Sequence, residues 1–156
     1  MEKLDVSQFQ GLLVGQFIAS ATGAILLALT DFGGFYYMNY YAGFEVWGYI
    51  YLGSGVLVSI LILAGIAGLI VALMAIVNSL NAKENVTADL LRQNALKSIK
   101  GAGFTASLAA LGAIVFAIDS MIEETDWWLS GGFYGAFIGG LLTVYFGKLI
   151  LERLGE

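Results

Sequence analysis

Residues 130–151 read SGGFYGAFIGGLLTVYFGKLIL, and this run decides how the chain folds. It carries no charge before Lys148 and has about the 20 residues that a helix needs to cross a bilayer. A bilayer forces the backbone to bond within itself, so the run is helical despite its glycines, and small residues let a second helix approach closely. One face repeats a small residue at every fourth position: Gly131, Gly135, Gly139, Thr143 and Gly147. The run therefore predicts a membrane helix that packs tightly through this face.

The first apolar run, residues 11–30, repeats the pattern with Gly11, Gly15, Ala19 and Gly23. A cleaved signal peptide is the alternative interpretation, because Ala19-Ser20-Ala21 resembles a small-residue cleavage site. The apolar run continues past that site to Leu29, which favours a spanning helix. We expect the first and fourth helices to make the closest contact in the bundle.

Two further apolar runs lie between these, of which the second is the longest, and the loop before the third contains a helix start. Thr87 is a suitable N-cap, and Asp89 would lie in the first turn, where its charge is favourable. The expected helices are about 11–30, 48–80, 88–119 and 130–151. The predicted fold class is therefore all-α, a polytopic membrane protein with four transmembrane helices in two hairpins and a single domain over residues 1–156.

The distribution of charge predicts the topology. All seven basic residues lie near the start of the sequence, in the polar middle segment at residues 83–100, or near the end. The first and third loops contain six carboxylates and no basic residue. Loops rich in Lys and Arg stay in the cytoplasm, so both termini are predicted to be cytoplasmic in a multi-pass cell-membrane protein. The expected partners are the lipid bilayer and further copies of the chain or other membrane subunits.

The first loop, residues 31–47, is rich in aromatic residues, and the third loop contains a Trp pair. Rings with polar tips favour the membrane–water interface, so we interpret them as an interfacial belt. The alternative is a surface that stacks a ligand or binds a partner. The belt consists of Tyr36, Tyr37, Tyr40, Tyr41, Trp47, Trp127 and Trp128.

The third loop also groups four carboxylates, Asp119, Glu123, Glu124 and Asp126. Carboxylates, carbonyls and water are the ligands that Ca²⁺ takes, so this loop is a possible cation site. A solvated acidic loop is the simpler interpretation.

The composition excludes most chemistry. The chain has no Cys and no His, and the interiors of the four apolar runs contain no ionisable residue. Catalytic residues, a cofactor and an ion-coupled transport mechanism are therefore not expected. The net charge of −5 argues against nucleic-acid binding. Gln16 is the most polar residue within a run, and we expect its amide to bond across a helix interface rather than to line a pore.

These observations predict a non-catalytic integral membrane protein that acts as a subunit of an oligomer or complex held by small-residue packing. The alternative is a pore or channel assembled from several copies. In that case the acidic outer vestibule would attract cations, and a hydrophobic constriction would gate the pore.

Overall fold

The computed structural model describes residues 7–37, 40–44, 54–82 and 86–155 and contains four long helices. Each of them is long and apolar enough to cross a membrane, as predicted. They are α1 (Ser7–Leu29), α2 (Ser54–Asn81), α3 (Ala88–Ile122) and α4 (Gly131–Arg153). The expected bounds are close to these, except that the expected start of the second helix at residue 48 lies outside the described residues.

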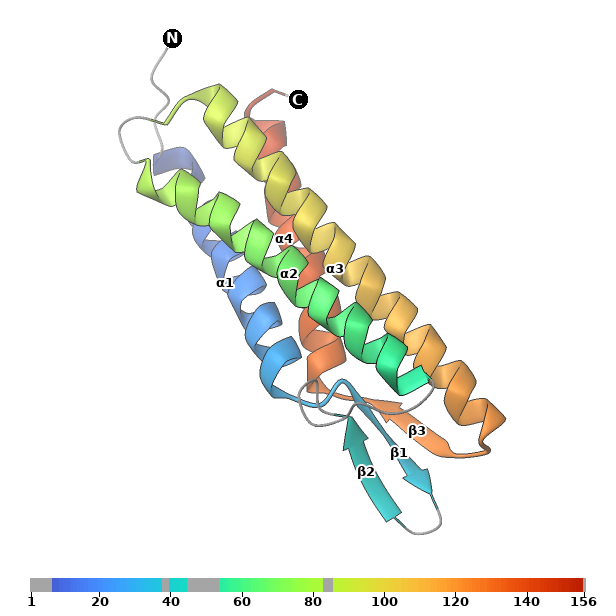
Figure 1. Cartoon of the computed structure of the whole chain (residues 1–156). Helices are drawn as coiled ribbons and strands as arrows, with labels where there is room; N and C mark the ends of the chain where they lie inside the picture. Colours follow the sequence, from blue (N-terminus) through green and yellow to red (C-terminus); the bar gives the residue numbers. More distant parts are fainter. Residues whose placement is uncertain (1–6, 38–39, 45–53, 83–85, 156) are drawn as a thin grey trace.

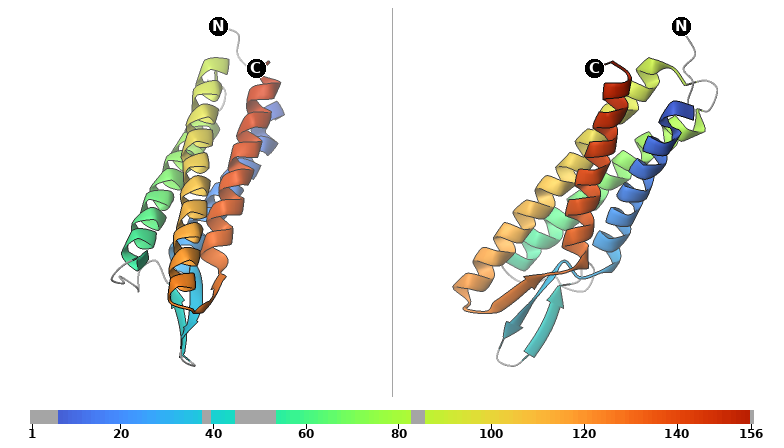
Figure 2. Two further views of the ribbon diagram at one scale, coloured as in Figure 1. Left: turned by 90° about the vertical axis from the view of Figure 1, so that its right-hand side faces the viewer. Right: turned by 180° about the vertical axis from the view of Figure 1, so that it is seen from behind.

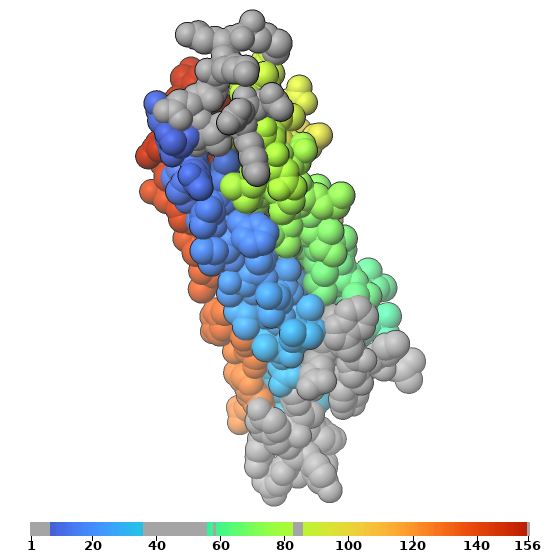
Figure 3. Space-filling view, turned by 90° about the vertical axis from the view of Figure 1, so that its left-hand side faces the viewer, coloured from blue at the N-terminus to red at the C-terminus, as the bar shows by residue number. Residues whose placement is uncertain are grey.

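The helices form an antiparallel bundle in which each contacts the preceding and the following helix in the chain (Figures 1 and 2). Because α1 also packs along α4, the four helices form a closed ring of neighbours. The most extensive contact of α2 is with α3. Figure 3 shows α1 flanked by α2 and α4 on one face of the molecule. The first residues of α1 and the last of α4 consequently lie at the same end of the bundle (Figure 1).

The opposite end carries a three-stranded antiparallel sheet, which the sequence analysis did not predict. Its strands are β1 (Gly33–Tyr37), β2 (Tyr40–Phe44) and β3 (Asp126–Leu129), in the order β2-β1-β3. The sheet projects beyond the ends of α1 and α4 (Figures 1 and 2). Aromatic residues favour strands, and the adjacency of α1 and α4 brings the first and third loops together.

The predicted aromatic belt is thus largely strand. Trp47 and the side chains of Tyr36, Tyr37, Tyr40 and Tyr41 lie outside what the structure describes, so their interfacial role stays a prediction. Trp127 and Trp128 are described, and both are partly buried on β3. Trp127 packs edge-to-face on Phe116 of α3, with ring centroids 6.0 Å apart.

Two glycines of β1 allow β3 to approach closely, and one of them, Gly33, also adjoins the bundle, because a Cβ atom there would lie 3.0 Å from the Phe116 ring of α3. A Cβ atom built at Gly33 would lie 2.7 Å from the backbone oxygen of Trp128, and one built at Gly34 would overlap the Trp128 indole. Phe32, which precedes them, is 1% exposed and makes an edge-to-face contact with Phe133 at the start of α4. The sheet is therefore fixed to the helices by close packing on both β1 and β3.

α3 begins at Ala88, as the sequence predicts. The Leu90 amide donates to the Thr87 hydroxyl over 3.2 Å, and Asp89 lies in the first turn, so the predicted N-cap is confirmed. This cap stands at the end of the bundle away from the sheet, beside a core formed by Phe9, Leu13, Ile76, Val86, Leu91, Ala95 and Ile150.

The end of α3 contains a strained residue. The Thr125 amide donates to the Ser120 carbonyl over 2.9 Å and the Glu124 amide donates to Met121 over 3.3 Å, which is a Schellman motif. Glu124 supplies its left-handed residue, with φ of 55°, a position that glycine occupies without steric cost.

Glu124→Gly is expected to stabilise the protein by about 0.5–1 kcal/mol, because relief of left-handed strain exceeds the extra entropy that glycine loses on folding. The measurement is the free energy of unfolding in lipid-containing micelles. The control is Glu123→Gly, where φ is −84° and glycine relieves no strain. A Glu124→Gly variant as destabilised as the control would contradict this account.

Candidate functional site: the contact between α1 and α4

The centre of the α1–α4 contact is backbone against backbone. A Cβ atom built at Gly139 would lie 2.8 Å from the Ala19 carbonyl oxygen and 2.9 Å from the Gly23 Cα atom. A Cβ built at Gly23 would lie 2.9 Å from the Gly135 carbonyl oxygen. No side chain fits at these glycines unless the two helices separate.

At other glycines of the two small-residue stripes the nearest atoms belong to side chains, as at Gly135, where a Cβ would overlap the Leu26 Cβ atom. A Cβ at Gly15 would meet the Phe146 ring at 3.1 Å, and one at Gly147 would lie 2.6 Å from Ile99 of α3. Gly131 is exposed and faces only the Thr30 side chain, at 3.0 Å. Gly11 has nothing within 4 Å. The structure thus brings the stripes into contact from Gly15 to Gly23 and from Gly135 to Gly147, and leaves Gly11 and Gly131 outside the contact.

A buried polar cluster lies beside this contact and joins three helices. The Gln16 amide nitrogen of α1 donates to the Ser98 hydroxyl of α3 over 2.7 Å and to the Thr143 carbonyl of α4 over 3.1 Å. One turn along α1, the Ser20 and Thr143 hydroxyls are 2.8 Å apart. Gln16 is 1% exposed, so its expected role as an interhelical hydrogen-bond donor is confirmed.

Each hydroxyl in this cluster donates its proton to an acceptor other than Gln16. Thr143 donates to the Gly139 carbonyl over 2.7 Å, and Ser98 donates to the Ala95 carbonyl over 2.8 Å. Ser20 therefore donates to Thr143. The Gln16 carbonyl oxygen Oε1 is buried and has no hydrogen-bond partner among the described residues. The cluster has one acceptor more than its donors can satisfy.

This imbalance makes Gln16→Met a mild substitution, with an expected change in unfolding free energy below about 1 kcal/mol. Interhelical bonds in membranes are worth about 0.6 kcal/mol on average, and methionine also removes the unpaired oxygen, whose burial costs about 1–3 kcal/mol. Gln16→Glu keeps the shape but replaces the donor, and should cost at least about 3 kcal/mol. Unfolding by denaturing detergent measures both, and a methionine variant less stable than the glutamate variant would refute the proton assignment.

The sequence analysis missed a second close contact, between α2 and α3. A Cβ atom built at Gly101 would lie 2.5 Å from the Gly68 carbonyl oxygen, and Thr105 donates its hydroxyl to the Gly65 carbonyl over 2.6 Å. The expectation that the first and fourth helices make the closest contact therefore needs correction, because α2 and α3 approach at least as closely. Gly68 repeats with Ala64 and Ala72 at every fourth position, but Gly101 directly follows Lys100, and nothing in the sequence marks it as a contact.

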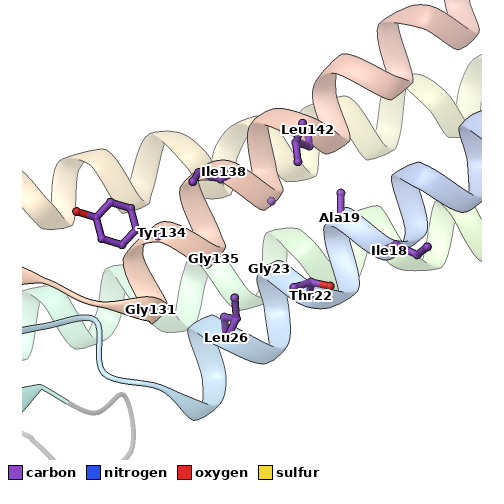
Figure 4. A pocket seen from close by; sticks show the side chains of 11 residues that line it. Ile18, Ala19, Thr22, Gly23, Leu26, Gly131, Tyr134, Gly135, Ile138 and Leu142 are labelled. Carbon is purple, nitrogen blue, oxygen red and sulfur yellow. The ribbon is translucent and has the colours of Figure 1, made fainter.

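The outer side of the α1–α4 contact is a groove of about 400 Å³. Its floor is the line of small residues where the two backbones meet, and bulky side chains from both helices form its walls (Figure 4). The lining residues are Ile18, Ala19, Thr22, Gly23, Leu26, Gly131, Tyr134, Gly135, Ile138, Gly139 and Leu142. Apart from Thr22 and Tyr134 these are all apolar or glycine.

The four carboxylates of the third loop do not form a metal site in the described part of the chain. No group of three or more Asp, Glu, His or Cys residues lies there with the spacing to hold an ion. Asp119, Glu123, Glu124 and Asp126 belong instead to the last turn of α3, its Schellman end and the first residue of β3.

Comparison with known proteins gives no match for the chain. No protein-family model, curated protein or solved structure matches it. Its function must therefore be argued from its own geometry.

Proposed function

We propose that the chain is a non-catalytic integral membrane subunit that docks another subunit through its sheet. The observation that carries the proposal is the β2-β1-β3 sheet, which contacts one end of the bundle through Gly33, Trp127 and the adjoining Phe32. An antiparallel four-helix bundle closes with short loops. Here the described parts of two loops form a three-stranded sheet that the closure of the bundle does not require.

The sheet offers the kind of surface that partners use. Within the described residues, β2 and β3 each pair with β1 on one side only. Unpaired backbone groups on such edges accept an added strand. The two loops that form the sheet contain six carboxylates and no basic residue, so the proposed partner presents a basic surface.

A homo-oligomeric pore receives less support. The polar side chains that could line one, led by Gln16, Ser20 and Thr143, are buried inside the single bundle. The outward faces of the helices carry large apolar side chains, which suit lipid or dry contacts better than a column of water. Examples are Ile18, Ile25, Ile60, Ile70, Phe104, Leu111, Ile114 and Leu141.

The proposed arrangement places the sheet outside and both termini in the cytoplasm, with the helices inserted as two hairpins. The absence of native cysteine allows a direct test with single thiols, Ser130→Cys near the sheet and Glu152→Cys near the end of α4. A membrane-impermeant maleimide applied to intact cells is expected to label Ser130→Cys alone. Labelling of Glu152→Cys alone would invert the topology, and labelling of neither before lysis would place the protein in an internal membrane.

Partner docking is tested by native mass spectrometry after gentle extraction from the native membrane. We expect a foreign chain to co-purify, and Asp126→Lys on β3 to reduce its recovery. Asp89→Lys, at the opposite end of the bundle, is the matched control and should leave recovery unchanged. A ring-sized homo-oligomer with no foreign chain would support the pore instead, and a bare monomer would refute both.

A further inference from the structure

We propose that the groove between α1 and α4 holds one hydrocarbon chain of a membrane lipid with an amine-bearing, zwitterionic headgroup. This proposal is independent of the proposed docking role of the sheet. The groove faces away from the bundle core, on the surface that a bilayer would cover.

The dimensions of the groove select its occupant. It extends along α4 from Gly131 to Leu142, which is roughly 17 Å at the helical rise per residue. A helix of that length and about 10 Å across would occupy roughly 1,300 Å³, about three times the groove volume of about 400 Å³. An extended alkyl chain is far narrower than a helix, so the groove can hold it along its length.

The walls exclude a partner helix for a second reason. Helix association through glycines requires the other backbone to reach the glycine surface. The floor glycines Gly23 and Gly139 are already in contact with each other, and bulky side chains rise on either side of them (Figure 4). The flanking residues include Ile18, Leu26, Tyr134, Ile138 and Leu142.

The position of the groove matches one leaflet. It begins at the first residue of α4, where the helix meets the sheet, and ends about 17 Å into the bundle. Half of a hydrocarbon core of about 30 Å is about 15 Å, so the groove spans the leaflet on the sheet side. The Tyr134 hydroxyl points away from the centre of the groove (Figure 4). Tyrosine with its polar tip in this position suits the headgroup boundary.

The negative charges near the sheet end of the groove determine which lipid headgroup is favoured there. Gly131 adjoins Thr30, and the Gly132 amide donates to the Asp31 carbonyl over 2.9 Å, so Asp31 lies at the end of the groove that faces the sheet. The first and third loops on this side contain carboxylates and no basic residue. An anionic headgroup would be repelled there, whereas the ammonium of an ethanolamine headgroup would be attracted.

The test uses phosphatidylethanolamine that carries a diazirine in one acyl chain, reconstituted with the full-length protein in nanodiscs. After photolysis, peptide mapping is expected to place the main label on groove residues such as Ile138 and Leu142. Thr22→Phe fills the groove from an exposed position without entering the α1–α4 contact. It should reduce this label about tenfold, which corresponds to an overpacking cost of about 1.4 kcal/mol.

Ile25→Phe is the matched control, since Ile25 is exposed on the same helix but does not line the groove, and labelling of the groove should persist. Thermal unfolding of both variants verifies that they are folded. Equal label on groove residues and on exposed Ile60 or Ile114 would refute the site, because it would show boundary lipid only. Equal labelling by phosphatidylglycerol with the same chains would refute the headgroup preference, and crosslinks to a second copy through the groove would refute the lipid occupant.

Discussion

Gly139→Leu is expected to destabilise the protein by at least about 3 kcal/mol, at the upper end of the usual cost of overpacking. The reason is that the atoms around this glycine are backbone, with the Ala19 carbonyl oxygen 2.8 Å from the position of a Cβ. Backbone of a packed helix cannot rotate out of the way as a side chain can. Relief requires α1 and α4 to separate, which also breaks the Ser20–Thr143 hydrogen bond one turn away.

The measurement is the free energy of unfolding of each variant in the same lipid–detergent mixture. Gly11→Leu is the matched control, because Gly11 belongs to the same small-residue pattern but has nothing within 4 Å, and its change should stay within about 0.5 kcal/mol. Gly15→Leu should destabilise the protein more than Gly11→Leu and less than Gly139→Leu, because the neighbour of Gly15 is the Phe146 ring, which can move. Equal stability of the Gly139 and Gly11 variants would show that the stripe is not a contact surface.

Gly101→Ala is the second substitution with a large expected effect, about 2–3 kcal/mol for a single added methyl group. A Cβ at this position would lie 2.5 Å from the Gly68 carbonyl oxygen and 3.2 Å from the Ala72 backbone nitrogen. The methyl group must push α2 away from α3, and the bond from Thr105 to the Gly65 carbonyl would lengthen with it.

Gly103→Ala serves as the control two residues along the same helix. Its added Cβ would meet only Val144, at an ordinary 3.7 Å, so the variant should be neutral or slightly more stable because alanine favours helix. Thermal unfolding of the pair gives the comparison. If both alanine variants unfold at the wild-type temperature, the close approach of α2 and α3 is not what holds that pair together.

The helices were predictable because the physics that defines them is local. Apolar length alone identifies a spanning segment, and the Thr87 N-cap is recognised from neighbouring residues. The approach of α1 to α4 through Gly23 and Gly139 was anticipated from spacing on one helical face. What spacing does not give is the partner of each face, and for that reason the contact of Gly68 with Gly101 was missed.

The sheet and the groove depend on residues that are distant in sequence. β1 and β2 are neighbours in the first loop, but β1 and β3 pair only because the bundle brings the first and third loops together, and the third loop alone has no strand partner that would reveal β3. Gly33 and Gly34 resemble ordinary loop glycines until Trp128 is placed against them. The groove likewise forms only when α1 and α4 are in contact, because side chains of both helices, such as Leu26 and Ile138, line it.

The order of strands in the sheet also constrains how the protein is made. β1 lies in the first loop, while its partner β3 follows α3, so the whole of α2 and α3 separates them in the chain. During synthesis β1 can pair with β2 at once, but its other edge stays open until α3 has been threaded and β3 has emerged. Long-range pairing of this kind is slow to form. Completion of the sheet therefore reports that α2 and α3 have both been made and brought into place, and a nascent chain halted before β3 would expose an unpaired edge to quality control.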